Sequence, residues 1–435
     1  MRSDFDAMVI GAGPAGSAAA MFLARAGWSV ALVEKRQFPR RKVCGECLAA
    51  SNWSILDALG VGEAYRAAAG PELKTLALLR ADSRVLAALP QGPSEGRPWG
   101  RALGRETLDT LLRDQARAAG VTLLQPCAVQ RVDGRMGDWR IEARALDARQ
   151  QHRLRAPVAI AANGSWEALP SGLAHPLPRR RASDLFAFKA NFRGAALREG
   201  ELSVLALEGG YGGMVLADDG LATVACCLRR DRLEACRRAQ PGLRAGDAVQ
   251  AWLVQACQGV RSALAPARRQ GPWLAAGPLD PGIRLRADDP MFRIGNAAGE
   301  AHPIVGEGMS MALQSAWLLS ATLLEGAGQA LPSRQGPASA AWQREVALRY
   351  AAAWKHQFAP RLRLAATFAQ ACMRPSSSAL LLGLARAWPG LLTQGARWSG
   401  KTRDITQGMS TTPGAGAARA APREPGPTAF TEEQP

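Results

Sequence analysis

The chain has 435 residues, a formal net charge of +17 and eight cysteines. A chain of this length fits two or three domains of about 150 residues each and buries a core without disulfide bonds. The cysteines lack the paired spacing of a disulfide framework, and no apolar stretch reaches the roughly 18–20 residues of a membrane span. The first strand-like run begins close to Met1 and leaves no room for a signal peptide, so we expect a cytoplasmic, thiol-reducing compartment.

The positive charge is mostly arginine and is spread along the whole chain. No basic segment interleaved with aromatic residues and no recognition-helix motif stands out, so we do not expect a nucleic-acid partner. An anionic membrane surface or an acidic amphiphilic substrate fits this charge better. Peripheral contact with a membrane is therefore one of the expectations, and the oligomeric state stays open.

An apolar run near the N-terminus ends in the pattern Gly-x-Gly-x-x-Gly. Gly11 allows a tight turn, Gly13 lets the backbone approach a pyrophosphate, and Gly16 lets the following helix pack closely on the sheet. The amide groups at the start of that helix, around Ala15, are suited to binding the pyrophosphate. Strand, loop and helix arrive in the order that a dinucleotide-binding unit requires, so this segment predicts a nucleotide cofactor.

A second apolar run follows the helix and ends in Glu34 and Lys35. A carboxylate at this place accepts hydrogen bonds from the ribose hydroxyls of an adenosine and disfavours a 2′-phosphate. FAD or NAD therefore fits this segment better than NADP.

The pattern along the chain predicts an α/β fold whose Rossmann-like FAD-binding domain is interrupted by an inserted antiparallel-sheet domain for the substrate and followed by C-terminal helices. The Pro-, Gly- and Ala-rich end of the chain predicts disorder. The expected units are a FAD-binding domain (1–80, 100–165 and 275–330), a sheet-rich domain (81–99 and 166–274), C-terminal helices (331–401) and a disordered tail (402–435).

Residues 291–311 form a second motif, in which a short strand leads through Gly295 and Asn296 into a loop and then a helix starting at about Met309. The Asn296 side chain suits a hydrogen bond to the ribityl chain of a flavin. The helix start suits the pyrimidine end of the flavin ring, where a helix dipole stabilises the negative charge of the reduced flavin by about 0.3–1 kcal/mol.

With both motifs in place, the chain resembles the flavin-dependent monooxygenase superfamily that includes p-hydroxybenzoate hydroxylase, and within it the geranylgeranyl reductase-like and halogenase-like branch. The resemblance rests on the N-terminal fingerprint and on segments 38–48, 105–109 and 295–309. It implies FAD as the cofactor, a flavin-side loop at Gly45, a contact from Arg105 to FAD and a backbone contact near Val129 on the adenine side. The motif of the last segment adds four cofactor-binding residues: Pro303, Gly306, Gly308 and Met309.

Two positions depart from the family pattern, because relatives usually carry Asp where this chain has Asn296, and Asp-Gly where it has Asn163-Gly164. Asn296 can still form the hydrogen bond to the ribityl chain, but it lacks the negative charge of the Asp in relatives. Neither departure argues against FAD, and both leave the flavin potential and the docking of NAD(P)H, the expected transient electron donor, open.

Cys44 and Cys47 admit three interpretations: a redox-active pair, a loop of small residues beside the flavin, or, as prenyl reductase relatives imply, a cysteine involved in turnover. No matching second cysteine pair exists, so no metal site is predicted. His302 lies in the flavin-side loop and is either structural or a general acid/base. Tyr211 stands where geranylgeranyl reductases carry an aromatic-rich substrate motif, but the Trp and Phe-Pro of that motif are missing.

A tryptophan-type halogenase would need a Trp-x-Trp-x-Ile-Pro stretch, which is absent, and a catalytic lysine, for which Lys74 is the candidate in the right neighbourhood. We therefore expect an FAD-dependent monooxygenase of secondary metabolism acting on an aromatic or polyketide-derived, lipophilic substrate. The alternatives are geranylgeranyl reductase-like reduction of isoprenoid double bonds and a non-catalytic flavin-binding partner. Tryptophans in the C-terminal helices belong to a core, an amphipathic cover over the substrate site, or a membrane-surface patch.

Overall fold

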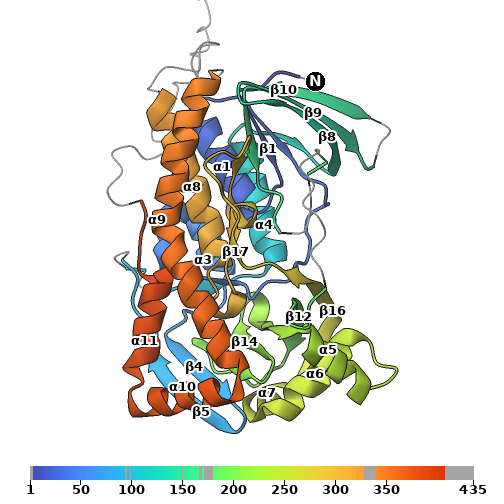
Figure 1. Cartoon of the computed structure of the whole chain (residues 1–435), viewed down its shortest axis with the longest axis vertical. Helices are drawn as coiled ribbons and strands as arrows, with labels where there is room; N and C mark the ends of the chain where they lie inside the picture. Colours follow the sequence, from blue (N-terminus) through green and yellow to red (C-terminus); the bar gives the residue numbers. More distant parts are fainter. Residues whose placement is uncertain are drawn as a thin grey trace, which may run out of the picture.

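A computed structural model describes residues 3–93, 96–97, 99–147, 150–165, 169–170, 180–327 and 339–406 (Figure 1). The first part of the predicted disordered tail, residues 402–406, continues from the last helical turn. The remainder of that prediction, 407–435, lies outside the described residues. No helix in the described part of the chain combines the length and the hydropathy that crossing a bilayer requires.

A five-stranded parallel sheet forms the centre of the N-terminal unit, in the order β18-β11-β1-β2-β7. β1, β2 and β11 are apolar throughout and buried throughout, as expected of parallel strands covered on both faces. The chain passes from β1 to β2 on one side and returns to β11 on the other, so β1 lies at the topological switch point. The strands are β1 (Ala7–Ile10), β2 (Val30–Val33), β7 (Thr122–Leu124), β11 (Val158–Ala161) and β18 (Phe292–Arg293).

Three helices cover one face of this sheet: α1 (Pro14–Arg25), α4 (Arg105–Ala118) and α8 (Gly308–Ala327). The ring of Phe22 on α1 meets Trp317 on α8 edge to face at 5.2 Å. The other face is covered by a three-stranded antiparallel sheet of β8 (Cys127–Arg135), β9 (Asp138–Ala145) and β10 (Gln151–Ala156).

A seven-stranded, mainly antiparallel sheet forms the second unit, in the order β16-β12-β15-β14-β13-β4-β5. One face packs against α5 (Arg230–Ala239), α6 (Ala245–Ala256) and α7 (Gln258–Leu264), and the opposite face turns toward the parallel sheet and the C-terminal helices. Its strands are β4 (Thr75–Arg80), β5 (Ser83–Ala88), β12 (Leu185–Arg193), β13 (Glu201–Leu207), β14 (Gly210–Leu216), β15 (Ala222–Arg229) and β16 (Arg268–Leu279).

The predicted α/β class with an inserted antiparallel sheet is confirmed, but two of the predicted boundaries cut through this sheet. The prediction places residues 75–80 in the FAD-binding domain, but they form β4, which pairs in parallel with β13. Residues 275–279, assigned to the same domain, are the end of β16. Strand pairing between distant segments decides both boundaries, and a local sequence pattern carries no information about such pairing.

The C-terminal helices join the two units (Figure 1). α9 (Ala340–Met373) runs along α8 and continues to the seven-stranded sheet, where α10 (Pro375–Ala387) and α11 (Gly390–Ala396) cover β4 and β5 before a π-helical turn (Arg397–Lys401). Trp354 lies in the core of the FAD-binding unit, whereas Trp388 and Trp398 are exposed by 63% and 61%. Short elements complete the fold: β3 (Cys47–Leu48), β6 (Arg101–Ala102), β17 (Gly282–Ile283), β19 (Gly299–Glu300), α2 (Trp53–Ala58) and α3 (Gly62–Ala68).

Candidate active site

Two adjoining cavities lie at the carboxyl ends of β1 and β2, where a doubly wound sheet binds its ligand. The first, about 1490 Å³, lies between the parallel and the seven-stranded sheets, and the second, about 2250 Å³, extends over β2 and β8; both volumes include space open to solvent. Gly13, Lys42, Val43 and Ala162 line both cavities. The two cavities therefore form one elongated site.

The glycine loop between β1 and α1 has the geometry of a pyrophosphate cradle. Gly11 has a φ of +104°, and a Cβ there would lie 2.5 Å from the carbonyl oxygen of Ala162. A Cβ on Gly16 would lie 1.8 Å from the carbonyl oxygen of Gly11, so this glycine is needed for packing. At Gly13 the nearest atom is an Arg105 nitrogen at 3.9 Å, so the space beside this backbone is free for a ligand.

Three cations gather beside that free space. The Lys42 ammonium has its pKa lowered to about 8 by burial and by the neighbouring charges of Arg105 and Arg40. Asp109 holds the Arg105 guanidinium with two hydrogen bonds of 2.7 and 2.8 Å. The buried Nε of Arg40 has no hydrogen-bond partner within the described residues. An anion such as a pyrophosphate would relieve this repulsion and pair that nitrogen, so the residues present fit FAD.

Of these three cations, only Arg105 is a predicted FAD contact. Arg40 and Lys42 are not among the predicted site residues. The signal was available in the sequence, because the basic run at 40–42 follows Glu34 by only a few residues. In a sequence, such a basic run looks the same whether it binds an anion or is a charged loop exposed to solvent. The fold is needed to distinguish the two.

The second cavity is lined by the residues predicted for the adenosine side: Glu34, Lys35 and Val129. Glu34 is buried, and its two carboxylate oxygens accept hydrogen bonds from the backbone N–H groups of Ala12 (2.8 Å) and Arg36 (2.7 Å). A carboxylate has about four lone-pair sites, so it can still accept from a ribose. Glu34 therefore also fixes the glycine loop, which the sequence did not indicate.

The loop before α8 lines the first cavity at its other end. Gly295, Asn296, Pro303, Gly306, Gly308 and Met309 all contribute to the wall, and α8 begins at Gly308, one residue before the predicted start. The Asn296 amide donates to Ser165 (2.9 Å) and to Glu300 (3.4 Å), and Arg284 binds Glu300 at 2.9 Å. The sequence did not single out Ser165 or Arg284 as the residues that orient Asn296.

His302 does not line the cavity itself and reaches it through Tyr211. The Tyr211 hydroxyl lies 3.1 Å from His302 Nδ1, and both side chains are buried. Burial lowers the pKa of His302 and raises the pKa of Tyr211 well above its usual value, so both are neutral near pH 7. A neutral imidazole can accept a proton that passes through the tyrosine hydroxyl.

Cys44, Gly45 and Cys47 also lie on the wall of the first cavity, and both cysteines are free thiols. Burial raises the pKa of the Cys47 thiol to about 12, and this thiol donates to the Gly45 carbonyl at 3.4 Å. Cys44 Sγ accepts from the Glu46 backbone N–H at 3.4 Å. Cys47 is thus a protonated thiol at neutral pH, which disfavours it as a thiolate nucleophile.

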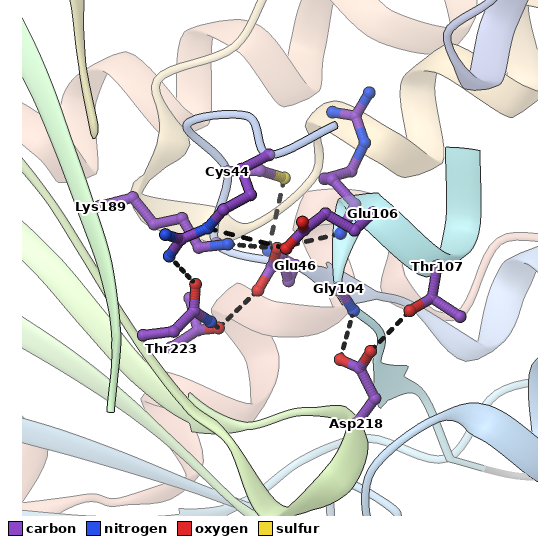
Figure 2. A network of polar contacts seen from close by, with 12 residues as sticks. Cys44, Glu46, Gly104, Glu106, Thr107, Lys189, Asp218 and Thr223 are labelled. Carbon is purple, nitrogen blue, oxygen red and sulfur yellow. Dashed lines mark hydrogen bonds and ion pairs between the residues drawn. The ribbon is translucent and has the colours of Figure 1, made fainter. Parts of the chain in front are cut away.

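Glu46 joins the flavin-side loop to the seven-stranded sheet, a link that sequence reasoning missed (Figure 2). Its backbone has a φ of +61°, and its buried carboxylate accepts from the Arg105 backbone N–H (3.0 Å), Lys189 on β12 and Thr223 on β15. Lys189 is buried as well, so this is an ion pair out of contact with water. The network fixes the position of the sheet relative to the FAD-binding unit.

Apolar side chains form the remaining walls of the first cavity. The seven-stranded sheet contributes Ala187, Phe188, Val204, Met214 and Leu279, and the loop before α8 contributes Ile304. A cavity with few convergent polar groups and an apolar lining is typical of a site for a lipophilic small molecule.

A comparison with protein families identifies an FAD binding domain. The FAD binding domain family matches residues 4–198. The chain is 26% identical over 360 residues to conditioned medium factor receptor 1 of Dictyostelium discoideum, covering 74% of this chain and 64% of that protein. It is 49% identical over 61 residues to menaquinone reductase of Mycolicibacterium smegmatis, covering 14% of this chain and 15% of that one. The chain thus spans less than two thirds of these relatives.

Solved structures resemble the whole fold. The myxobacterial chondrochloren halogenase CndH has a TM-score of 0.68 at 20% identity, with 93% of both chains covered. A geranylgeranyl bacteriochlorophyll reductase-like protein of Thermoplasma acidophilum has a TM-score of 0.67 at 17% identity, with 95% of both covered. PqsL of Pseudomonas aeruginosa, described as a probable FAD-dependent monooxygenase, has a TM-score of 0.61 at 17% identity and covers 92% of this chain and 99% of its own.

The site and the family match identify residues 4–198 as an FAD-binding domain. The fold is shared with a flavin-dependent halogenase, a geranylgeranyl reductase-like protein and PqsL, as the resemblance to the flavin monooxygenase superfamily predicts.

Proposed function

We propose that the protein is an FAD-dependent monooxygenase that hydroxylates a lipophilic aromatic or polyketide-derived substrate. The observation that carries this proposal is the buried Tyr211–His302 pair, of which Tyr211 lies on the wall of an apolar cavity. A phenol or enol becomes more reactive toward an electrophilic oxygen when it loses its proton, and this pair can take that proton inside the dry cavity. Tyr211 would contact the substrate hydroxyl, and His302 would act through Tyr211.

The residues divide the work between cofactor and substrate. When bound, FAD would supply hydride acceptance from NAD(P)H and the reduced flavin that reacts with oxygen. The glycine loop with Arg40, Lys42 and Arg105 would hold the pyrophosphate, and Asn296 would hold the ribityl chain. The apolar walls would orient the substrate and keep water away from the reacting atoms.

No second glycine fingerprint follows in the sequence, which supports a transient encounter with NAD(P)H instead of a dedicated nicotinamide domain. A small-molecule lipophilic substrate fits the cavity lining.

The decisive experiment supplies the FAD-loaded protein with NADH or NADPH, long-chain 4-alkylphenols as probes and ¹⁸O₂. We expect substrate-dependent oxygen uptake and a product heavier by one ¹⁸O atom, with no label from H₂¹⁸O. The absence of oxygen uptake above the no-substrate rate with either donor would contradict the proposal.

Tyr211→Phe tests the proton-accepting pair, and Tyr350→Phe is its matched control. Tyr350 is also buried, and its hydroxyl donates to the Arg293 carbonyl (2.8 Å) away from the cavity. We expect Tyr211→Phe to lower kcat about 100-fold at pH 7 and to change the pH profile, since positioned proton transfer contributes about 10²–10⁴-fold. Tyr350→Phe should leave kcat within a factor of two; equal losses in both variants would point to a structural role for Tyr211.

A second candidate is the reduction of a carbon–carbon double bond in an isoprenoid. The observation that favours it is the protonated Cys47 thiol on the cavity wall, which can donate a proton to the carbon next to the one that accepts hydride. This reaction proceeds without oxygen, so product formation from a menaquinone probe in an anaerobic chamber distinguishes it from hydroxylation.

Halogenation has less support from the side chains, although halogenases share the fold. The lysine expected from the resemblance, Lys74, has a side chain 59% exposed that pairs with Glu72 at 3.4 Å, and it does not line the first cavity. Adding bromide or chloride to the oxygen experiment tests this outcome, because a halogenase yields a product carrying the halogen.

A further inference from the structure

Helix α10 is apolar on two opposite faces. Ser378, Leu382 and Ala385 are buried against the rest of the molecule. On the other side, Leu380 and Leu384 lie one turn apart and are exposed by 65% and 50%, and Trp388 at the end of the helix is exposed by 63%. We refer to Leu380, Leu384 and Trp388 as the α10 apolar face. A helix that is hydrophobic all round is normally buried on all sides, so the exposed face is suited to a partner.

The charge around this face is positive. Residues 364–396, from the last turns of α9 to the end of α11, contain Arg374 and Arg386 and no Asp or Glu. Arg374 and Arg386, at the start and near the end of α10, are exposed. Arg80 on β4 adds positive charge from the strand beneath, where its guanidinium donates to Ser378 at 2.9 Å. Such a surface is complementary to a negatively charged partner.

The acidic groups on the neighbouring elements do not cancel this charge. Glu201 on β13 is paired with Arg84, and Glu208, next to the Gly209 N–H that donates to Met373, is paired with Arg232. Asp82 in the turn between β4 and β5 is exposed. A second copy of the chain is a poor occupant of the face, because a two-fold contact through α10 would bring Arg374 and Arg386 of both copies together.

The position of α10 relative to the cavity gives the face a function. Its buried side belongs to the same apolar cluster as Tyr211, Leu279 and Ile304, which line the first cavity. Figure 1 shows α10, α11, β4 and β5 together at the end of the molecule opposite the N-terminus. A lipid bilayer at α10 would therefore lie next to the apolar part of the molecule that encloses the substrate site.

We propose that the α10 apolar face and its arginine rim dock the protein on the surface of an anionic lipid bilayer. Leu380, Leu384 and Trp388 would insert at the boundary between headgroups and acyl chains, where tryptophan is favoured, and Arg374 and Arg386 would contact the acidic headgroups. Resting on the proposed function, the docked enzyme would take its lipophilic substrate directly from the bilayer.

The test is co-sedimentation of the FAD-loaded full chain with vesicles of phosphatidylcholine containing 30% phosphatidylglycerol and with vesicles of phosphatidylcholine alone. We expect at least tenfold tighter binding to the anionic vesicles, and loss of that advantage in about 0.5 M salt, where the Debye length is only a few ångströms. The double variant Leu384→Ser/Trp388→Ser and the variant Arg374→Glu should each weaken binding at least tenfold.

Leu348→Ser is the matched control, because Leu348 is exposed by 57% on α9 and lies outside the α10 face. The FAD content and Tm of every variant show whether it is folded. Failure of the folded protein to bind anionic vesicles, or equal binding by the double variant, would overturn the proposal. Concentration-dependent dimerisation in sedimentation velocity that the double variant abolishes would also overturn it, by assigning the face to a second copy.

Discussion

The two ends of the elongated site are built in different ways. The pyrophosphate end consists of backbone from one short loop, Gly11 to Gly16, with cations closing over it from the next loop. The substrate end consists of side chains from strands far apart in the sequence, such as Val204, Met214 and Leu279. The pyrophosphate end depends on the absence of side chains, and the substrate end depends on which side chains are present. Substitutions at the first end should therefore affect folding or FAD binding, and substitutions at the second should affect the reaction with the substrate.

The largest effects are expected in the glycine loop. Gly16→Val should prevent folding, because even its Cβ would lie 1.8 Å from the Gly11 carbonyl oxygen. Gly13→Val should leave the Tm of the apoprotein nearly unchanged, since the space beside Gly13 is free, yet weaken FAD binding at least 100-fold by filling that space. FAD fluorescence quenching measures the affinity. A Gly13→Val protein that binds FAD normally would contradict the assignment of the cradle.

The next effect concerns the link between the two units. Glu46→Gln leaves the Lys189 ammonium buried without its counter-charge and should lower the free energy of unfolding by about 3–5 kcal/mol. Adding Lys189→Met removes the stranded charge and should recover much of the loss, as measured by urea unfolding. If Glu46→Gln alone had no effect, the ion pair would not hold the sheet on the FAD-binding unit.

A smaller effect comes from the pH dependence of FAD binding. Lys42 has a pKa of about 8, and a bound pyrophosphate favours its charged form, so FAD affinity should be constant below pH 8 and fall above it. The fall should approach tenfold per pH unit until the pKa of the complex is reached. Lys42→Met should bind FAD more weakly at pH 7 and lose this pH dependence, whereas the exposed Lys35→Met should retain it.

The smallest effect is expected at Lys74. Its side chain is exposed and pairs with Glu72, and such a surface pair contributes about 0–1 kcal/mol. Lys74→Met should therefore leave turnover and Tm within experimental error. A large loss of turnover would restore this lysine as a halogenase-type residue.

The cofactor end of the site comes from short segments of sequence and the substrate end from distant ones, and this difference explains what could be predicted from the sequence. The glycine loop, Glu34 and the start of α8 are local patterns, so the class of fold could be predicted from short segments, and all the residues predicted to bind FAD except Gly16 line the two cavities. Tyr211 and His302 each attracted attention alone, but they are 91 positions apart, and only the fold brings them into contact. Glu46 and Lys189 are 143 positions apart, and neither was predicted as a site residue.

Helix α9 connects the two units and therefore affects how they can move relative to each other. It contains 34 residues, which corresponds to about 51 Å of helix at about 1.5 Å per residue. Trp354 and Phe358 pack in the core of the FAD-binding unit, while Ala369 and Cys372 pack in the apolar cluster under the seven-stranded sheet. Pro360 lies between these two packed ends and removes one helical hydrogen bond, so a hinge rotation between the units would bend α9 there or detach one end of it. We therefore expect any rotation between the two units to pivot near Pro360, while both ends of α9 stay packed.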